Sequence, residues 1–260
     1  MGTGTETRVY WTREQVDAEL DGWTVAVVDC LRATTTIAAA LDAGCTSVIP
    51  MAEEGEARRC AAERGALLAG ERGCVPPPGF DLGNSPAAFT PQVVGGREVV
   101  LWTTNGSGAL VRAARGAAEV LAFALVNAGA TAAHLAQRRC PRLAIVCAGT
   151  EGEFSLEDAF AAGALIDRLS RREGRRGSLD DRGRAAWLLY RGGRRDARGV
   201  LDAGAAAARL RQRGLGADVA FAARADALGV VALWRAGALR LAEPAGATAA
   251  SGGAPALGRS

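Results

Sequence analysis

Asp29 and Arg32 stand three residues apart in the turn D-C-L-R-A-T-T-T, directly after the apolar run Val25–Val28 and before a helical pattern. Thr34 and Thr35 follow them at the expected helix start. A carboxylate, a guanidinium and free helix-start amides suit the binding of a metal ion and an oxyanion together. The alternative is that the threonines only cap the helix and that Asp29 pairs with Arg32. Two further turns of the same kind favour a binding site.

The second turn, T-T-N-G-S-G, follows the apolar run Val99–Trp102 and again leads into a helical pattern. Thr104 and Asn105 supply polar groups, and Gly106 permits close approach of a ligand to the backbone. The turn lacks the G-x-G-x-x-G spacing of dinucleotide sites, so it is weak support for a nucleotide. It predicts a second group of ligand contacts.

The third turn, A-G-T-E-G-E-F, and the helix start after it contain four acids within eight residues: Glu151, Glu153, Glu157 and Asp158. Hard divalent cations prefer several oxygen ligands, and Asp29 is expected on the same edge of the fold. The alternative is that Glu157 and Asp158 only complement the dipole of the helix that they begin. The number of acids favours a metal site.

A loop rich in glycine and proline, residues 70–83, ends at Asn84, Ser85 and Pro86. Ser85 is expected as the N-cap of a helix whose first position is Pro86. On its own, this pattern is more often a helix cap than a ligand site.

Between these turns the chain alternates apolar, strand-like runs with helical patterns. Such alternation predicts an α/β fold with a mainly parallel sheet, in which the loops at the carboxyl ends of the strands converge on one edge. The expected strands are Val25–Val28, Thr46–Met51, Ala66–Ala69, Val99–Trp102, Val120–Leu125 and Leu143–Cys147.

The last third of the chain gives weaker signals. We expect a short helix at Ala185–Tyr190 and a helix Val219–Asp226 with Asp218 as its cap. Val230–Trp234 and Ala238–Leu241 are expected to form a terminal hairpin.

The 260 residues, 49% of them hydrophobic, are enough to bury a large core. We expect one α/β domain over residues 1–242, which could divide into two closely packed subdomains, and a disordered Ala/Gly/Pro tail over residues 243–260. The formal charge of +3 is too small to imply a nucleic-acid partner, and no apolar stretch reaches membrane-spanning length. The one protein partner that we consider is a second copy of the chain, in a homodimer.

The chain contains no lysine and one histidine, His134, which excludes a phosphate-loop lysine, a Schiff base and a histidine-rich zinc site. Its six cysteines show no C-x-x-C spacing, so neither a structural zinc site nor a disulfide framework is expected. We expect buried free thiols in a reducing compartment. We therefore expect a soluble, cytoplasmic protein.

Five motifs run in order from about Val25 to Trp234: VVDCLRATTT, FDLGNSP, TTNGSGAL, CAGTEGEFSLEDAFAAG and DVAFAARADALGVVALW. Together they resemble the 2-phosphosulfolactate phosphatase family, magnesium-dependent phosphatases of coenzyme M biosynthesis. The resemblance implies a three-layer α/β sandwich with a central mixed, largely parallel sheet and helices on both faces. It also implies hydrolysis of (2R)-phospho-3-sulfolactate, or of a related small phosphorylated hydroxy acid. The resemblance thins over residues 171–198, where ten arginines stand against four acids, and beyond Leu241.

Carried onto this chain, the resemblance points to residues in all of the turns: Asp29, Arg32, Asn84, Ser85, Thr104, Asn105, Gly106, Glu157 and Asp158. We assign Asp29 with Glu157 and Asp158 to Mg²⁺, directly or through water, and regard Glu151 and Glu153 as weaker metal candidates. Arg32, with the turns that contain Thr34, Thr35 and the other polar residues, is expected to bind the phosphate. Asp29 and Arg32 are therefore the expected catalytic residues.

Three other classes of function were weighed against this one. A non-catalytic binder of small anionic metabolites would use the same turns but would not need clustered acids. A dinucleotide-dependent oxidoreductase would need G-x-G-x-x-G after the first strand, where this chain has D-C-L-R-A-T. Other phosphatase chemistries also fit poorly, because Leu31 stands where an aspartyl-phosphate enzyme has its second acid, and Glu153 stands where a cysteine phosphatase has its arginine.

Overall fold

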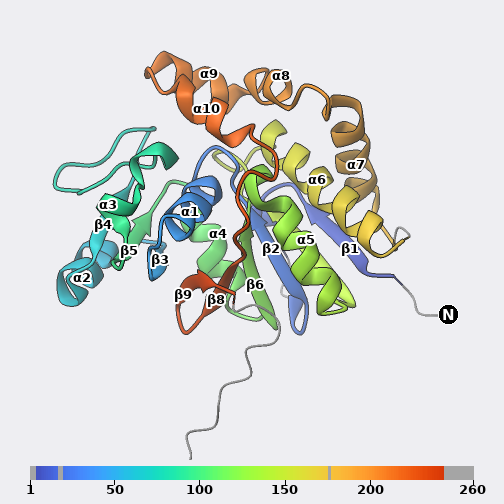
Figure 1. Cartoon of the computed structure of the whole chain (residues 1–260), viewed down its shortest axis with the longest axis horizontal. Coiled ribbons are helices and arrows are strands. Elements are labelled where there is room, and N and C mark those ends of the chain that lie inside the picture. Colours follow the sequence, from blue (N-terminus) through green and yellow to red (C-terminus); the bar gives the residue numbers. More distant parts are fainter. Residues whose placement is uncertain (1–3, 17–19, 175–176, 243–260) are drawn as a thin grey trace, which may run out of the picture.

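The computed structural model describes residues 4–16, 20–174 and 177–242. In these residues nine strands form one sheet, with helices on both of its faces (Figure 1). The disordered tail expected at residues 243–260 lies outside the described residues and stays a prediction. The strands are β1 Glu6–Tyr10, β2 Thr24–Val28, β3 Ser47–Met51, β4 Leu67–Gly70, β5 Glu98–Trp102, β6 Glu119–Phe123, β7 Arg142–Cys147, β8 Ala232–Arg235 and β9 Ala238–Leu241.

Helices connect most of these strands. Three short 3-10 helices, η1 Arg13–Gln15, η3 Pro86–Ala88 and η4 Leu125–Asn127, accompany the α-helices. The α-helices are α1 Ala33–Asp42, α2 Glu54–Arg64, α3 Pro91–Val94, α4 Gly106–Ala113, α5 Ala128–Gln137, α6 Leu156–Arg172, α7 Asp181–Gly193, α8 Ala197–Asp202, α9 Ala205–Gln212 and α10 Gly216–Ala222.

The sheet contains two parallel groups joined by a hairpin. Strands β1, β7, β2 and β6 run parallel in that order, and so do β3, β5 and β4. The hairpin β8–β9 lies between the groups, pairing antiparallel with β6 on one side and with β3 on the other. The predicted hairpin is therefore confirmed, but its place is the middle of the sheet.

Three antiparallel steps separate β6 from β3, so the two parallel groups run in opposite directions along the sheet order. Nevertheless Asp29, which follows β2, and Thr104, which follows β5, line the same pocket. In addition, Val27 of β2 and Leu101 of β5 belong to one apolar cluster with Ile37 of α1. The sheet therefore bends back on itself, with α1 and α4 packed between its two groups.

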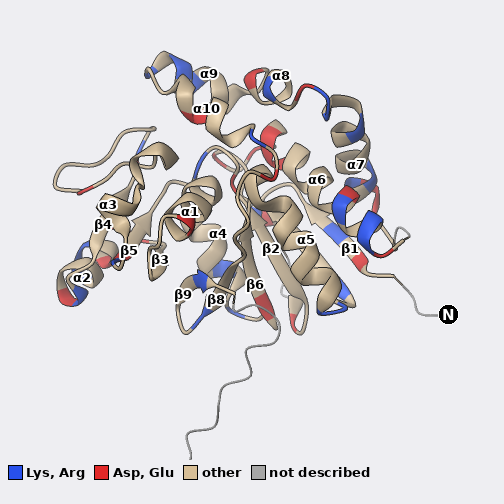
Figure 2. Ribbon diagram, in the orientation of Figure 1, with Lys and Arg blue, Asp and Glu red and all other residues tan. Residues whose placement is uncertain are grey.

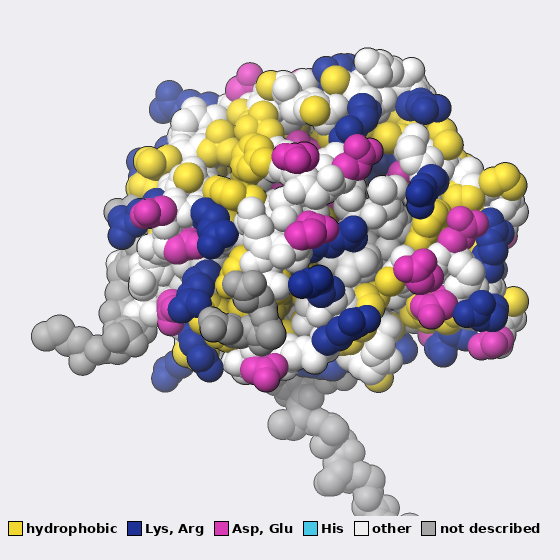
Figure 3. Space-filling model, turned by 180° about the vertical axis from the view of Figure 1, so that it is seen from behind, with side chains coloured by type: hydrophobic (Ala, Val, Ile, Leu, Met, Phe, Trp, Pro, Cys, Tyr) yellow, Lys and Arg dark blue, Asp and Glu magenta, His cyan; other side chains and the backbone are white. Residues whose placement is uncertain are grey.

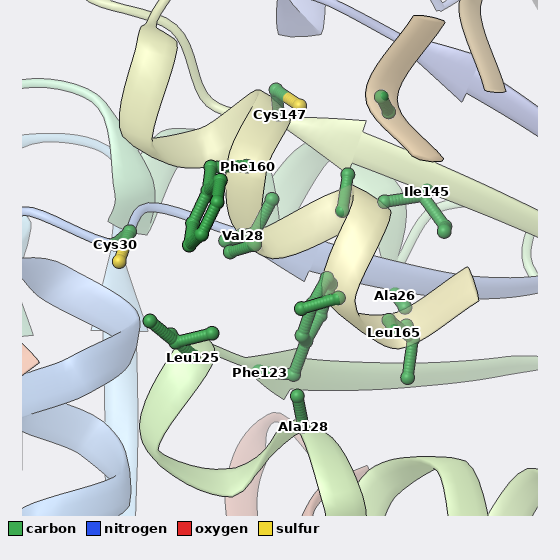
Figure 4. Packing of buried hydrophobic residues seen from close by; sticks show 14 of the residues in the cluster. Ala26, Val28, Cys30, Phe123, Leu125, Ala128, Ile145, Cys147, Phe160 and Leu165 are labelled. Atoms are coloured by element: carbon green, nitrogen blue, oxygen red, sulfur yellow. The ribbon is translucent and has the colours of Figure 1, made fainter. Parts of the chain in front are cut away.

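Alternate residues of β2 face opposite sides of the sheet, as strand geometry requires. Val25 and Val27 pack toward α1 and α4, whereas Ala26 and Val28 pack toward α5 and α6. Figure 4 shows Phe160 of α6 among these buried side chains. Helix α2 covers the outer face of β3, β4 and β5. The three-layer α/β fold that was predicted is confirmed.

Two predicted helices have different bounds. Helix α7, Asp181–Gly193, is longer than the predicted Ala185–Tyr190, because Asp180 caps it by accepting a hydrogen bond from the Gly183 amide at 2.7 Å. Helix α10 begins at Gly216, before Asp218, so the prediction that Asp218 caps this helix was wrong.

In the described part of the arginine-rich segment, residues 171–174 and 177–198, several arginines pair with nearby acids. Arg171 contacts Asp167 at 2.8 Å, and Arg198 contacts Asp202 at 2.5 Å, both four residues apart. Seen from behind, the molecule likewise shows basic and acidic side chains interspersed (Figure 3).

Two further expectations concern the whole chain. All six cysteines are free thiols; four are buried, as expected, whereas Cys60 and Cys74 are only partly buried. Within residues 4–16, 20–174 and 177–242, none of the helices has both the length and the apolar character needed to cross a membrane.

Candidate active site

A pocket of about 250 Å³ lies where the turns after β2, β4, β5 and β7 meet helix α9. In Figure 1, helices α8, α9 and α10 lie along the top of the molecule, above these turns. Six of the predicted site residues line this pocket, namely Asp29, Arg32, Asn84, Thr104, Asn105 and Glu151. The pocket also contains residues that the sequence did not single out, chiefly Glu71, Arg209 and Arg213.

Asp29 lies directly after β2 and is only 8% exposed. One oxygen of its carboxylate accepts a hydrogen bond from the Ala33 amide at 3.3 Å, at the start of α1. Burial, together with the negative charges of Glu71 and Glu157, raises the pKa of Asp29 to about 7. A cation bound next to this carboxylate would stabilise its charged form.

Arg32 is buried and forms an ion pair with Asp218 of α10, with 2.7 Å between its Nη1 and Oδ2 of the acid. Its Nη2 donates to the carbonyl oxygen of Cys74 at 3.0 Å. The structure thus pairs Arg32 with Asp218 and not with Asp29. Asp218 also accepts a hydrogen bond from the hydroxyl of Ser85, so that Ser85 supports the arginine indirectly.

The hydroxyl groups of Thr34 and Thr35 bond to the backbone of their own turn. Thr34 donates to the carbonyl of Asp29 at 2.9 Å, and Thr35 donates to that of Cys30 at 2.7 Å. Both residues are fully buried and do not line the pocket. They hold the turn that presents Asp29 and Arg32, and their direct contact with phosphate stays a prediction.

Two polar atoms in the pocket wall have no hydrogen-bond partner within the described residues. They are Oδ1 of Asn84 and Oγ1 of Thr104, both buried. Buried polar atoms are normally paired, since an unpaired one costs about 1–3 kcal/mol. Because both atoms lie in the pocket wall, a bound ligand or a water molecule can supply the partner.

Gly106 brings the helix start of α4 against Asp29. A Cβ atom at this position would lie 2.5 Å from Oδ2 of Asp29 and 2.6 Å from Cβ of Ala33. Only glycine fits here, which explains the glycine of the second turn. The neighbouring Asn105 lines the pocket and its Oδ1 accepts a hydrogen bond from the Glu151 amide at 3.4 Å.

Asp158 lies beneath the pocket and does not line it. Its two oxygens accept hydrogen bonds from the amides of Cys30, at 2.7 Å, and Gly149, at 3.2 Å. Burial and the charges of Asp29 and Glu157 raise its pKa well above the usual value. Asp158 therefore connects the turn that contains Cys30 to the turn that contains Gly149 through hydrogen bonds.

Glu157 and Glu153 line a second hollow, of about 230 Å³, which shares Glu151 and Arg209 with the main pocket. Burial raises the pKa of Glu157. The metal roles predicted for Glu157, Glu153 and Asp158 stay predictions.

Glu71 is a pocket residue that sequence reasoning missed. One of its carboxylate oxygens accepts from the Thr104 amide at 3.0 Å and the other from the Cys74 amide at 2.8 Å. The signal was available, because Glu71 directly follows β4 just as Asp29 directly follows β2. Glu71 and Asp29 place two carboxylates in one pocket.

The described residues contain no group of three or more acidic, cysteine or histidine side chains that could hold a metal ion. Mg²⁺, however, commonly binds through one or two carboxylates and completes its coordination with water and substrate oxygens. Asp29, with its raised pKa, and Glu71 fit such a site. Oxygen donors without histidine or thiolate also suit Mg²⁺ better than zinc.

The chain was compared with known proteins. The family model described as 2-phosphosulpholactate phosphatase matches residues 10–237. Proteins named probable 2-phosphosulfolactate phosphatase are similar to this chain over most of their length. One from Deinococcus radiodurans is 41% identical over 200 residues, covering 76% of this chain and 82% of its own.

Two other relatives carry the same name. The protein from Synechococcus sp. is 40% identical over 227 residues, 84% of this chain and 91% of its own. The protein from Caldanaerobacter subterraneus is 35% identical over 235 residues, 87% of this chain and 94% of its own. The chain therefore belongs to the 2-phosphosulfolactate phosphatase family, a family of phosphoric monoester hydrolases.

Proposed function

We propose that this protein is a Mg²⁺-dependent phosphatase that hydrolyses (2R)-phospho-3-sulfolactate to 3-sulfolactate and phosphate. The observation that carries the proposal is the juxtaposition of Asp29 and Glu71 with the unpaired polar atoms of Asn84 and Thr104 in one pocket. Carboxylates for a cation, a hydroxyl that can donate to a phosphate oxygen and a carboxamide oxygen that can accept from water are parts that suit phosphoryl transfer to water. Family membership supports the same substrate.

In the hydrolysis, a water oxygen bonds to phosphorus, the bond between phosphorus and the C2 oxygen breaks, and one hydrogen of the water ends on that oxygen. Negative charge spreads over the three phosphoryl oxygens on the way. A Mg²⁺ ion bound by Asp29 and Glu71 would polarise these oxygens. The Thr104 hydroxyl and the side-chain NH2 group of Asn84 donate to the phosphoryl oxygens, and the remaining guanidinium N–H groups of Arg32 stabilise their charge.

The proposal also covers where the enzyme works. We infer a cytoplasmic location, supported by six free cysteines in a chain that requires no disulfide.

Phosphate release by the purified protein tests the proposal. The panel contains 2-phosphosulfolactate and other C3 and C4 phosphoacids, each with Mg²⁺ and after thorough chelation. We expect the highest kcat/KM for 2-phosphosulfolactate and loss of activity on chelation. Undiminished turnover in chelator would contradict the metal requirement. Binding of these acids without hydrolysis of any would instead favour a non-catalytic binder of anionic metabolites.

Substitution of the two pocket carboxylates tests whether they bind the cation. Asp29→Asn and Glu71→Gln should raise the Mg²⁺ concentration needed for half-maximal activity, so that added Mg²⁺ partly restores turnover. Glu56→Gln, on the exposed side of α2, is the matched control and should leave the metal response unchanged. Equal loss at all Mg²⁺ concentrations would assign the two acids a role other than metal binding.

A further inference from the structure

Helix α9 covers the pocket, and its position is fixed by apolar contacts. Ala207 and Leu210 of this helix are buried in the core cluster that includes α6. At its start, Gly204 is so close to Glu157 that a Cβ atom there would lie 2.8 Å from the carboxylate oxygen. The helix is thus seated on the third turn, and the side chains on its pocket side are held over the site.

Two arginines of this segment, Arg209 and Arg213, line the pocket one helical turn apart. Neither forms an ion pair or a side-chain hydrogen bond with any described residue. Arg211, between them, does not line the pocket and pairs instead with Asp202 at 2.7 Å. The free guanidinium groups therefore lie on the pocket side, and the paired one lies outside it. Figure 2 shows basic positions on α9 above acidic positions in the turns beneath.

The charge of Arg32 is already balanced by Asp218, at 2.7 Å. Among the described residues that line the pocket, Arg209 and Arg213 are the cations that form no ion pair, although the charge of Arg209 also acts on Glu157. All three arginines lie close enough to act on Cys74: burial raises the pKa of its thiol, and the three positive charges offset only part of that rise. The two free arginines thus face the same part of the pocket as Arg32.

The substrate proposed above carries a phosphate, a sulfonate and a carboxylate. The turns supply a site for the phosphate, but among their described residues that line the pocket the one cation is Arg32, whose charge Asp218 already balances. We propose that Arg209 and Arg213 bind the sulfonate and the carboxylate, and so make the enzyme selective for phosphoesters with two further anionic groups. This proposal rests on the proposed function. A planar guanidinium can contact two oxygens of either group at once.

Two substrates that differ by the sulfonate test this role. The kcat/KM values for 2-phosphosulfolactate and 2-phospholactate are measured with the wild-type chain, Arg209→Gln, Arg213→Gln and the double variant. We expect each single change to lower kcat/KM for 2-phosphosulfolactate by about tenfold or more, the usual effect of losing a charged hydrogen bond, mainly through KM. The double variant should lower kcat/KM less for 2-phospholactate than for 2-phosphosulfolactate. 2-Phospholactate has no sulfonate, so only the contact with its carboxylate can be lost.

Arg211→Gln is the control, since it removes a neighbouring arginine of the same helix that lies outside the pocket. It should change neither kcat/KM by more than about twofold. Equal losses on both substrates would show that the two arginines act only on groups that both substrates carry and not on the sulfonate, and no loss would show that they contact no substrate. Either result overturns the proposal.

Binding of the product separates this proposal from the proposed function. Calorimetric titration with 3-sulfolactate and with lactate needs no turnover. We expect the wild-type chain to bind 3-sulfolactate more tightly and the double variant to lose that preference. If the wild-type chain releases no phosphate from 2-phosphosulfolactate, the proposed function fails, and the titration still decides the anion site. Absence of any preference for 3-sulfolactate in the wild-type chain overturns the site.

Discussion

Arg32 and Asp218 form a buried ion pair across 186 positions of the chain, with 2.7 Å between guanidinium and carboxylate. The arginine belongs to the turn after β2 and the acid to helix α10, so the pair connects the first turn of the site to its cover. The Ser85 hydroxyl, which also donates to Asp218, adds the loop before η3. Three separate parts of the chain thus depend on one carboxylate.

We predict that Asp218→Asn destabilises the protein and lowers its activity. Removal of one partner from a buried ion pair typically costs about 3–5 kcal/mol, because the other charge stays buried without compensation. Arg32 would also lose the contact that orients it, so that kcat/KM should fall by at least about tenfold. Thermal unfolding and phosphate release measure the two effects.

The control for this change is Asp202→Asn, which breaks surface pairs with Arg198 and Arg211. Exposed pairs contribute about 0–1 kcal/mol, and the control should therefore unfold close to the wild-type temperature. Equal destabilisation by both variants would show that the buried pair of Arg32 and Asp218 contributes no more to stability than the exposed pairs of Asp202.

The two glycines of the second turn should respond differently to alanine. In Gly106→Ala the new methyl group would lie 2.5 Å from Oδ2 of Asp29, and we expect a loss of roughly a hundredfold in kcat/KM as Asp29 is displaced. At Gly108 the nearest atom is the end of the Arg13 side chain, which can move away. Gly108→Ala should therefore stay within about threefold of the wild type. Steady-state kinetics with circular dichroism as a check of folding distinguishes the two, and equal activity of both variants would contradict the packing described here.

The raised pKa of Asp29 predicts how stability changes with pH when no metal is bound. The folded protein holds this proton up to about pH 7, whereas the unfolded chain releases it near pH 4. The folded state therefore binds more protons in this interval, and its stability falls as the pH rises from about 4 to about 7. In chelator, Asp29→Asn should raise the melting temperature at pH 8 but have little effect at pH 4.5.

Calorimetry at the two pH values checks this prediction, with the same variant serving as its own control. A lower melting temperature of Asp29→Asn at pH 8 would show that the carboxylate is stabilised in the fold without a cation.

We predict that no cysteine acts as the nucleophile. Burial raises the pKa of Cys30 and Cys147 well above the usual value, and it also raises that of Cys74, which lines the pocket. Since the thiolate is the reactive form, these thiols are poorly suited to attack phosphorus. Serine at each position should keep kcat within about tenfold, through local packing effects alone. Abolished turnover in a folded Cys74→Ser variant would restore covalent chemistry.

The contribution of the sequence to these results differs from turn to turn. The apolar run before Asp29 predicted a strand, which β2 confirms. The site at its end was inferred because sites form at the carboxyl ends of parallel strands; Asp29 and Arg32 line a pocket there, and their roles stay predictions. Asp218 was misassigned because an acid at a helix start usually caps it, and no local pattern shows a partner 186 residues away. Arg209 and Arg213 were missed because a helix rich in alanine and arginine does not show which face is covered.

The bend of the sheet could not be predicted from the sequence either. The alternation of strands and helices predicted a largely parallel sheet, and the hairpin of Val230–Trp234 and Ala238–Leu241 was expected at the end of the chain. Its insertion between β6 and β3 depends on contacts between parts of the chain that are far apart, which periodicity does not record.

The central position of this hairpin in the sheet affects how the chain folds during its synthesis. During synthesis, β3 and β6 leave the ribosome early, but the strands that cover their free edges are among the last described residues. Open strand edges invite pairing with other chains, and pairings distant in sequence form slowly. Until β8 and β9 emerge, the nascent chain carries two exposed edges at its centre, and the interval before their closure is when it is most open to misassembly.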